Sequence, residues 1–444
     1  MEKKKKKKGK KKGKKKPSLP EPDIKTRIEI KFAQILKESE KKVPEEFKLP
    51  YEEFEYKKWD YEFVKGGTLG EGSFGSVFAV TEKSSGNEFA VKIFKHDLDD
   101  EESFIKEVRF SKYGKAVSVS HLIINVFHYG ILVNTPKWVM DKVYEKSPRD
   151  RRKDPELRIR HYFIVMEKMS GSLEDLLVFL NGLITPTSEK EGQQYVMSIV
   201  YEIFRILIIA LFKIVNKGIM LNDIKPANVL YREEKLKDRV VDFYFKFSDY
   251  SLSCYSADID VEFSSKYKTP ETDIRNYKCP IGGPTAPPMY TPPETGSLTG
   301  YFSDIAFNIW QLGQTLLQML LLSRHKMYTI DKTGKRTRKY GYIIEFIERN
   351  STIKIFYNMD DVIRDIIPFF IEDESFRSKL EFMLLAIFIM LDEDMTNRVS
   401  GFISLRDLLQ NDPKRVKLIE DDPIIIKGRK KVKASLELLL LSKK

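Results

Sequence analysis

Cysteine is scarce in this chain, and long apolar segments are absent. The 444 residues include only 2 cysteines, Cys254 and Cys279, too few for a disulfide framework in a chain of this size. We therefore expect two free thiols, rather than a disulfide or redox switch, and a reducing compartment, cytoplasmic or nuclear. The longest apolar run, Phe382 to Leu391, is far shorter than the roughly 18 residues of a membrane-spanning helix, so it predicts a buried helix.

Most of the chain also lacks an excess of positive charge, although the net charge is +12. Residues 1–16 contain 12 lysines and one glutamate, which accounts for +11 of that total. This composition predicts a disordered tail. No apolar signal segment follows it, and Glu2 excludes the myristoylation pattern. The tail is expected either to contact acidic surfaces of lipid, nucleic acid or protein, or to be solvated without a specific partner.

The remaining sequence divides into a strand-rich part and a helical part. Residues 17–60 form a charged N-terminal extension with an expected amphipathic helix from Asp23 to Lys42. From Tyr61, short β-branched and aromatic runs broken by glycine predict three successive antiparallel strands. A helix at 99–114 and a strand at 161–169 complete this smaller lobe, 61–168.

The second lobe, 169–410, has mainly helical periodicity and is followed by a C-terminal extension, 411–444. The helices are expected over 173–183, 194–215, 302–322, 359–371, 375–391 and 404–409. Two polar insertions interrupt these blocks, 137–160 and 251–293, and the first is expected to be a surface loop. The length suits a bilobal enzyme, and the pattern predicts an α+β fold with a small antiparallel sheet and one main helix in the first lobe.

A glycine-rich stretch lies between the first two expected strands. "LGEGSFGSVF" places Gly70, Gly72 and Gly75 in GxGxxG spacing. Glycine allows backbone N–H groups to approach phosphate oxygens closely. Strand-like sequence continues after the motif, which disfavours a dinucleotide-binding turn and leaves a phosphate loop or a plain hairpin.

The next strand carries a lysine among apolar residues, in "FAVKIF". A core-facing lysine is costly unless it meets an anion, and the following helix offers Glu107 as a partner for Lys92. A surface lysine that extends its amine into water is the alternative.

Polar residues then follow a long apolar helix, in "LNDIKPANVL". Asp223, Lys225 and Asn228 lie in this loop, and Asp249 follows a later short strand. Two carboxylates and an amide oxygen suit Mg²⁺ held jointly with substrate phosphates. Each polar residue alone could be a turn or helix cap, but the order and spacing of all these elements would then be accidental.

With these motifs in place, the chain resembles a eukaryotic protein kinase of the Ser/Thr type from about Tyr61 to Leu409. The resemblance implies ATP with Mg²⁺ or Mn²⁺ as cofactors and proteins as substrates. It implies that Asp223 accepts the proton of the substrate hydroxyl, that Lys225 steadies the γ-phosphate, and that Lys92 holds the α- and β-phosphates while paired with Glu107. Asn228 and Asp249 would hold the metals, and Glu294 would pair with Arg398.

The resemblance also implies a nucleotide site. Its expected members are Leu69, Gly70, Gly72, Ser73, Gly75, Val77, Ala90, Lys92, Met166, Glu167, Met169 and Leu230. Among them, Met166 occupies the gatekeeper position, and the backbone of Glu167 and Met169 would meet adenine.

Several positions depart from the family pattern. Leu221 and Asn222 replace the usual His-Arg before the catalytic Asp, so switching through an arginine and a phosphorylated loop is not expected. "DYS" replaces Asp-Phe-Gly, and Ser251 lacks glycine's conformational freedom. Asn308 stands where an acidic residue usually anchors the catalytic loop.

Three functions are therefore compared. An active kinase is favoured because the charged set is complete, and a pseudokinase that binds ATP as a scaffold is the alternative. A nucleic-acid-binding protein is supported only by the lysine tail, so it would require binding that survives deletion of residues 1–16.

Overall fold

The computed structural model describes residues 49–72, 75–95, 100–145, 159–182, 189–236, 239–256, 269, 271–275, 277–279, 290–295, 304–322, 328–330, 336–338, 374–410 and 423–430. The chain divides into two units, Met1–Lys48 and Leu49–Lys444, and every described residue belongs to the second. The lysine tail and the helices expected over 23–42 and 359–371 lie outside the described residues. None of the helices in the described ranges has the length and hydropathy of a membrane span.

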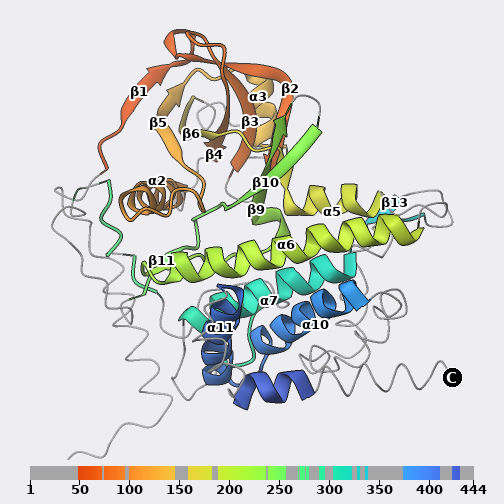
Figure 1. The fold of residues 1–444 in the computed structure, drawn as a ribbon. Helices are drawn as coiled ribbons and strands as arrows, with labels where there is room; N and C mark the ends of the chain where they lie inside the picture. Colours follow the sequence, from red (N-terminus) through yellow and green to blue (C-terminus); the bar gives the residue numbers. More distant parts are fainter. Residues whose placement is uncertain are drawn as a thin grey trace, which may run out of the picture. The chain divides into compact units, whose positions relative to one another are not determined.

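The first lobe is a six-stranded sheet in the order β1-β5-β6-β4-β3-β2 (Figure 1). Its strands are β1 (Glu52–Glu55), β2 (Tyr61–Glu71), β3 (Gly75–Glu82), β4 (Glu88–Phe94), β5 (Val126–Val133) and β6 (Arg160–Glu167). A 3-10 turn, η2 (Tyr56–Lys58), joins β1 to β2. The three expected antiparallel strands are confirmed as β2, β3 and β4. The sheet is antiparallel except for β1 and β5, which pair in parallel.

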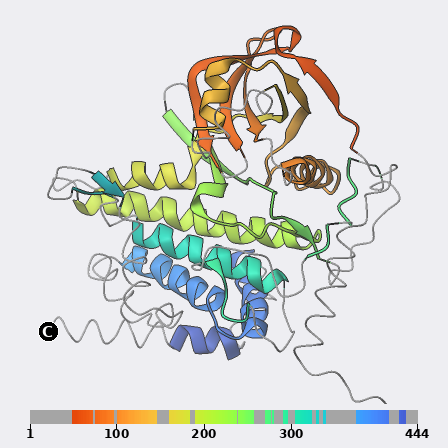
Figure 2. The same cartoon turned by 180° about the vertical axis from the view of Figure 1, so that it is seen from behind.

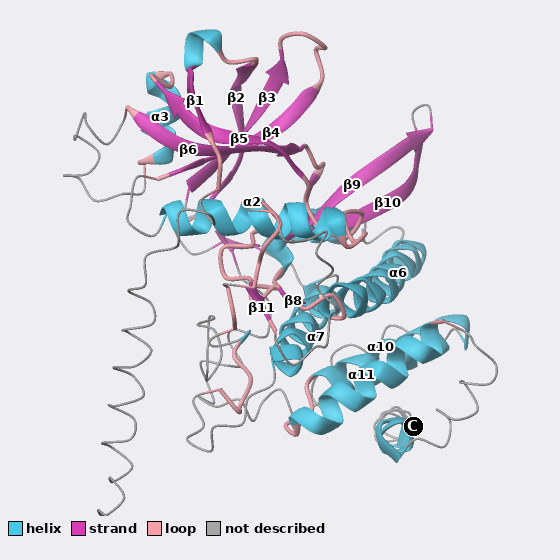
Figure 3. Cartoon of the chain, turned by 90° about the vertical axis from the view of Figure 1, so that its left-hand side faces the viewer, coloured by secondary structure: helices cyan, strands magenta, loops and turns pink. Residues whose placement is uncertain are grey.

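Strand β4 serves two hydrophobic cores because its side chains alternate between the faces of the sheet. Ala90 and Phe94 belong to the core beneath the sheet, which includes residues of helix α2 (Asp100–Ala116). Val91 and Ile93 belong to the core on the other face, against helix α3 (Lys137–Val143). Figure 3 shows the two helices on different sides of the sheet. Lys92 therefore points to the α2 side.

Helix α3 corrects the expectation for the insertion 137–160. Its first residues are not a surface loop, because Val139, Met140 and Val143 are buried against the sheet. An apolar i, i+1, i+4 pattern, "WVMDKV", gives this short helix one buried face. Residues 146–158 lie outside the described part of the chain.

The second lobe is mainly helical. Its helices are α5 (Leu173–Gly182), α6 (Glu189–Val215), α7 (Asp304–Leu322), α10 (Glu374–Met390), α11 (Met395–Leu409) and a helix over residues 423–430. Helix α6 lies between the sheet lobe and α7, as seen from both sides (Figures 1 and 2). Its buried residues, among them Leu207, Leu211 and Ile214, belong to the same core as Trp310 of α7.

Short strands and a turn carry the loops between these helices. They are β7 (Gly171–Ser172), β8 (Ile219–Met220), η4 (Pro226–Asn228), β9 (Val229–Leu236), β10 (Arg239–Phe247), β11 (Cys254–Tyr255), β12 (Tyr328–Ile330) and β13 (Arg336–Arg338). β10, β9 and β7 form one sheet, and β11 pairs with β8. The antiparallel β8–β11 pair places the segment after Asp249 beside the loop that carries Asp223.

Helix α11 begins nine residues before the expected start at Ser404. Asp394 caps it, since its side chain accepts from the backbone N–H of Thr396 at 2.8 Å and of Asn397 at 3.2 Å. Gly401 inside the helix weakens the sequence signal, because glycine has low helix propensity. The structure requires it there: a Cβ on Gly401 would lie 2.5 Å from a side-chain carbon of Ile389 in α10.

Candidate active site

Lys92 is buried, 8% exposed, and faces two carboxylates from different lobes. Its Nζ forms an ion pair with Glu107 of α2, and it lies 3.6 Å from Oδ1 of Asp249. The expectation that this strand lysine has an anionic partner is confirmed. A lysine of the sheet and an acidic residue of the helical lobe thus meet in one site.

Two opposing effects, burial and charge pairing, set the pKa values of Lys92 and Glu107. Burial lowers the pKa of Lys92, but the carboxylates of Asp249 and Glu107 outweigh it and raise the pKa above its ordinary value. For Glu107, burial outweighs the attraction of Lys92 and raises the pKa to about 7. Lys92 is therefore charged in this site, because two carboxylates face it.

Asp223 sits in the loop after β8 and is 9% exposed. The Lys225 amine donates to Asp223 Oδ2 at 2.7 Å. The Asn228 side-chain amide donates to the same oxygen at 2.7 Å and to the Asp223 carbonyl at 2.9 Å. These bonds fix the carboxylate and bring together the three polar residues of "LNDIKPANVL". The second oxygen, Oδ1, takes no part in these bonds.

Helix α7 supports this loop through side chains that bond its backbone. Asn308 Oδ1 accepts from the N–H of Leu221 at 2.8 Å and of Asn222 at 3.2 Å. Gln311 accepts from the N–H of Ile224 at 3.1 Å and donates to the Asn222 carbonyl at 2.8 Å. The sequence analysis singled out Asn308 but not Gln311. The signal was present as an amide spaced i, i+3 from Asn308 in a largely apolar helix.

Asp249 adopts a left-handed backbone conformation, with φ of 62°. The Ser251 hydroxyl donates to Asp249 Oδ1 at 2.7 Å, and the Ser251 N–H lies 3.4 Å from the same atom. Burial raises the pKa of Asp249, but Lys92 and these two bonds outweigh it and hold the pKa below its ordinary value. The serine in place of the family's glycine therefore orients and stabilises the carboxylate in this structure.

Asn228 and Asp249 are joined through Ser248. The Asn228 carbonyl accepts from the Ser248 N–H at 2.9 Å and from the Ser248 hydroxyl at 3.0 Å. Because Asp249 is the next residue, the two expected metal ligands are held on neighbouring backbone.

The donor set fits a hard divalent cation. Asp249 supplies carboxylate oxygens, and Asn228 has its amide nitrogen committed to Asp223, so its amide oxygen is the atom with ligand chemistry. No group of three or more His, Cys, Asp or Glu side chains that could hold a metal occurs in the described ranges. Two protein oxygen donors suit Mg²⁺ or Mn²⁺ held together with nucleotide phosphates, as expected from the sequence.

Five of the residues expected around the nucleotide share one hydrophobic core: Val77, Ala90, Met166, Met169 and Leu230. Ala90 and Met166 are direct partners in the β4–β6 pair. Leu69 is instead 46% exposed at the end of β2.

The side chain of Glu167 is engaged by its neighbours. It accepts from the Lys246 amine at 2.6 Å and from the Asn125 backbone N–H at 2.9 Å. The side chain of Glu167 is therefore engaged within the protein. The roles of these nucleotide-site residues stay predictions.

The glycine-rich stretch is a hairpin between β2 and β3. Gly70 pairs with Val77, and the Gly72 N–H donates to the Gly75 carbonyl at 2.8 Å. Gly75 packs against β4, where a Cβ would lie 2.2 Å from the Ile93 carbonyl oxygen. No atom of the described residues beyond its chain neighbours lies within 4 Å of the place where a Cβ on Gly70 would be, so the backbone at Gly70 is accessible on that side. Ser73, the remaining expected member, lies outside the described residues.

Glu294 and Arg398 form the expected pair deep in the helical lobe. Arg398 Nη1 lies 2.7 Å from Glu294 Oε1, and Nη2 lies 3.1 Å from Oε2. The guanidinium also donates to the carbonyls of Ala306 and Asp392 and packs over the Trp310 ring at 5.0 Å. This bidentate, buried pair ties the segment before α7 to α11.

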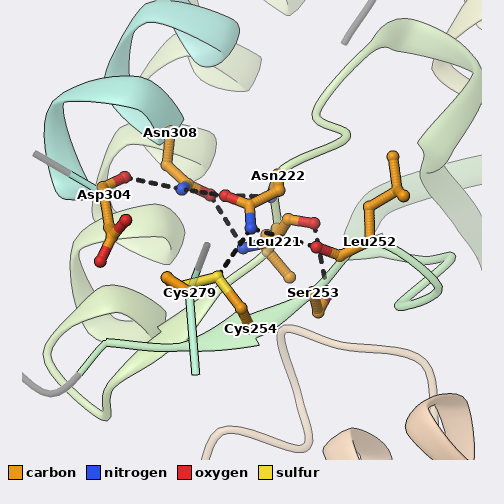
Figure 4. The surroundings of a disulfide bond; sticks show 8 residues. All are labelled: Leu221, Asn222, Leu252, Ser253, Cys254, Cys279, Asp304 and Asn308. Atoms are coloured by element: carbon orange, nitrogen blue, oxygen red, sulfur yellow. Dashed lines mark hydrogen bonds between the residues drawn. A yellow bond between two sulfur atoms is a disulfide. The ribbon is translucent and has the colours of Figure 1, made fainter. Parts of the chain in front are cut away.

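Cys254 and Cys279 form a disulfide, so the expectation of two free thiols is wrong for this structure (Figure 4). Their Cα atoms lie 4.8 Å apart although 25 positions separate them in sequence. The side-chain amide of Asn222 donates to Cys254 Sγ at 2.9 Å and to the Leu252 carbonyl at 3.1 Å. The two cysteines meet because the backbone of Tyr255 bonds to Tyr277 and Cys279, a contact that the number of cysteines could not reveal.

Comparison with known proteins agrees with this geometry. The family model described as "Protein kinase domain" matches residues 63–410. The chain belongs to the protein kinase family. The α+β bilobal kinase fold expected from the sequence is confirmed.

Two curated relatives resemble this protein kinase domain at low identity. They are "Serine/threonine-protein kinase dkf-1" of Caenorhabditis elegans and its namesake of Caenorhabditis briggsae, each 25% identical over 258 residues. The match covers 57% of this chain but only 27% and 25% of those proteins. The chain thus matches about a quarter of the length of these relatives.

Proposed function

We propose that the chain transfers the γ-phosphate of ATP to serine or threonine hydroxyls of protein substrates. One observation carries the proposal: Lys92, Glu107 and Asp249 meet in a buried charged group, and Asp223 is held by Lys225 and Asn228 in the adjoining loop. Family membership supports the same reaction. These are the charged groups on which phosphoryl transfer depends.

The roles follow from the positions of the groups. Asp223 accepts the proton of the substrate hydroxyl as the hydroxyl oxygen bonds to the γ-phosphorus and the bond to the β–γ bridging oxygen breaks. Lys225, at 2.7 Å from Asp223, steadies the γ-phosphate beside the base. Lys92, held by Glu107, contacts the α- and β-phosphates. A bound Mg²⁺ or Mn²⁺ supplies charge neutralisation at the phosphate oxygens. The protein contributes mainly positioning and electrostatic stabilisation.

Serine and threonine are the proposed acceptors for two reasons. Lys225 follows the catalytic Asp by two residues, as in Ser/Thr kinases and unlike the Ala-rich loops of tyrosine kinases. The two relatives are also named as serine/threonine kinases.

The test is transfer of labelled γ-phosphate to peptide substrates in the presence of Mg²⁺. Removal of the base in Asp223→Ala should lower kcat by about 10²–10⁴-fold, with little change in the KM for ATP. Asp249→Asn should lower kcat and raise the Mg²⁺ concentration that half-saturates the reaction. Asp60→Asn, which alters an exposed carboxylate of the sheet lobe, is the control and should retain full activity. Equal activity in all four proteins would show that the site is wrongly assigned.

The pseudokinase alternative is not favoured. A scaffold that only binds ATP has no need of an oriented base, yet Asp223 is buried and fixed by two side-chain donors. Nucleotide binding without transfer to any serine, threonine or tyrosine peptide would instead support the scaffold.

The lysine tail is proposed to contact acidic surfaces, of lipid, nucleic acid or protein. Binding to anionic vesicles, duplex DNA and acidic peptides should each weaken on deletion of residues 1–16 if the tail carries it. Nucleic-acid binding that persists after the deletion would point to a site in the folded part.

A further inference from the structure

The disulfide connects β11, which lies beside the catalytic loop, to a segment that packs on α2. We call residues 271–275 and 277–279 the strap. The strap follows the Asp249 region in sequence, and Cys279 is its last described residue before residue 290. It lies near three parts of the site: β11, the catalytic loop and α2.

The strap contacts α2 through Tyr277. The Tyr277 hydroxyl accepts from the Arg109 guanidinium at 3.1 Å, and the Arg109 side chain lies over the ring at 5.6 Å. The Lys106 amine lies over the same ring at 5.5 Å, and the Phe110 ring centroid is 6.2 Å away. These three residues flank Glu107, the partner of Lys92, along α2. The strap therefore packs on the helical turn that positions this glutamate.

A further contact joins the strap to the sheet. The Tyr129 hydroxyl of β5 donates to Glu271 Oε1 at 2.6 Å. The strap is thus held at Glu271 and Tyr277 by the sheet lobe, whereas its end is held from the helical lobe.

That end is fixed beside the catalytic loop. The Tyr255 N–H donates to the Tyr277 carbonyl at 2.7 Å, and the Cys279 N–H donates to the Tyr255 carbonyl at 3.1 Å. Across β11, Cys254 pairs with Met220, only three residues before Asp223. The Cys254–Cys279 bond adds a covalent link to this arrangement, next to Asn222 (Figure 4).

Asn222 connects the disulfide to the catalytic base, Asp223. It has a left-handed backbone, with φ of 61°, and immediately precedes Asp223. Its side chain donates to Cys254 Sγ and accepts from the Asn308 amide at 3.0 Å. Its strained conformation is thus held from one side by α7 and from the other by the disulfide.

We propose that the Cys254–Cys279 bond is a redox latch that holds the strap against α2 and Asn222 in place beside Asp223, so that the disulfide form is the more active kinase. The proposal rests on the proposed function and names its regulation. Disulfides of proteins in reducing compartments are usually transient or redox-sensing, which suits a chain with no other cysteine.

The chemistry balances with a peroxide as oxidant and a thiol as reductant. In formation, the two thiols lose two protons and two electrons to hydrogen peroxide, which becomes two waters as the S–S bond forms. In opening, a glutathione thiolate attacks one sulfur, and a second glutathione releases it, giving two protein thiols and one glutathione disulfide. Cys279 is half-buried, and Cys254 is 4% exposed, so Cys279 is the accessible sulfur.

Reduction removes the covalent link between β11 and the strap. Cys254 stays in β11 through its pairing with Met220, so we expect the strap end, once released from it, to move outward. We expect this movement to loosen Tyr277 on α2 and the Asn222 side chain together.

The experiment compares the full-length protein in its disulfide and dithiol forms. After oxidation with hydrogen peroxide or reduction with glutathione, thiol content, phosphoryl transfer and hydrogen exchange of residues 100–116 are measured. Reduction should lower kcat about fivefold or more, the low end of coupling between sites. Exchange in α2 should quicken, and reoxidation should restore both values.

Three variants separate the latch from other effects of reductant. Cys254→Ser and Cys279→Ser should each have the kcat and α2 exchange of the reduced protein, and neither should respond to glutathione. Lys278→Ala changes an exposed strap residue beside the bond and should respond as the wild type does.

Several outcomes would overturn the latch. They are equal kcat and equal exchange in both forms, higher kcat in the dithiol form, failure of peroxide to form the bond, or reduction only on unfolding. A redox-dependent exchange of α2 without phosphoryl transfer in either form would support the latch while refuting the proposed kinase activity.

Discussion

The Glu294–Arg398 pair makes a quantitative prediction for stability that is independent of catalysis. The Arg398 side chain is 0% exposed and that of Glu294 is 10% exposed, so both charges are shielded from water. Removal of one partner of a buried ion pair costs about 3–5 kcal/mol, because the other charge is left uncompensated.

The structure decides where in that range each substitution falls. In Glu294→Gln the guanidinium keeps three bonds to the carbonyls of Ala306 and Asp392, and it keeps its packing on Trp310. We expect a loss near the low end, about 3 kcal/mol. Arg398→Met leaves the carboxylate and these carbonyls without their donors, so we expect about 5 kcal/mol.

The assay is urea unfolding followed by tryptophan fluorescence. Of the 3 tryptophans, Trp310 is the one in the helical lobe and touches the pair. Glu53→Gln removes the same charge from an exposed pair with Arg160, with side chains 50% and 57% exposed. This control should cost at most about 1 kcal/mol. A loss for Glu294→Gln no larger than that of the control would refute the reasoning.

Two further predictions concern Ser251 and Asp394. Ser251→Ala removes a hydrogen bond to the Asp249 carboxylate, so the Mg²⁺ concentration that half-saturates the transfer assay should rise about tenfold. Ser251→Thr keeps the hydroxyl and should stay near wild type. An unchanged value in the Ala variant would exclude the orienting role of Ser251. Asp394→Ala should destabilise the protein by about 1 kcal/mol in urea, and Asp394→Asn, which keeps the cap acceptor but not the charge, should lose less. Backbone bonds lower the pKa of Asp394. The negative charge therefore stabilises the folded protein fully above the unfolded pKa of about 3.9, and this stabilisation is lost as the pH falls through the lower folded pKa. Equal losses of stability for Asp394→Ala at pH 7 and pH 2 would contradict the role of Asp394 as a charged cap.

The sequence predicted those features that depend on local patterns. The alternation in β4 gave both the strand and the inward direction of Lys92, and the helical spacing gave α5, α7 and α10 to within a few residues. Strand β1 was not predicted, because "EEFE" has the charge of a surface extension. A parallel edge strand of this kind leaves little trace in composition.

The site was predictable as a set of residues but not as a network. Spacing identified Asp223, Lys225, Asn228 and Asp249 as a polar set. It could not show that Ser251 bonds Asp249, because that depends on the left-handed backbone at Asp249.

The disulfide depends on nonlocal pairing. Cys254 and Cys279 are 25 positions apart, and the backbone bonds of Tyr255 to Tyr277 and Cys279 bring them together. Sequence spacing carries no signal for such a contact.

The close approach of Gly75 to β4 has a consequence for folding fidelity. A Cβ at this place would lie 2.2 Å from the Ile93 carbonyl oxygen, so any shift that put a residue with a side chain opposite Phe94 would collide with backbone. A slip of one residue between strands also sends every side chain to the opposite face. Gly75 thereby helps to fix the register between β3 and β4. In this register the amine of Lys92, rather than an isoleucine or valine side chain, reaches the carboxylates below the sheet.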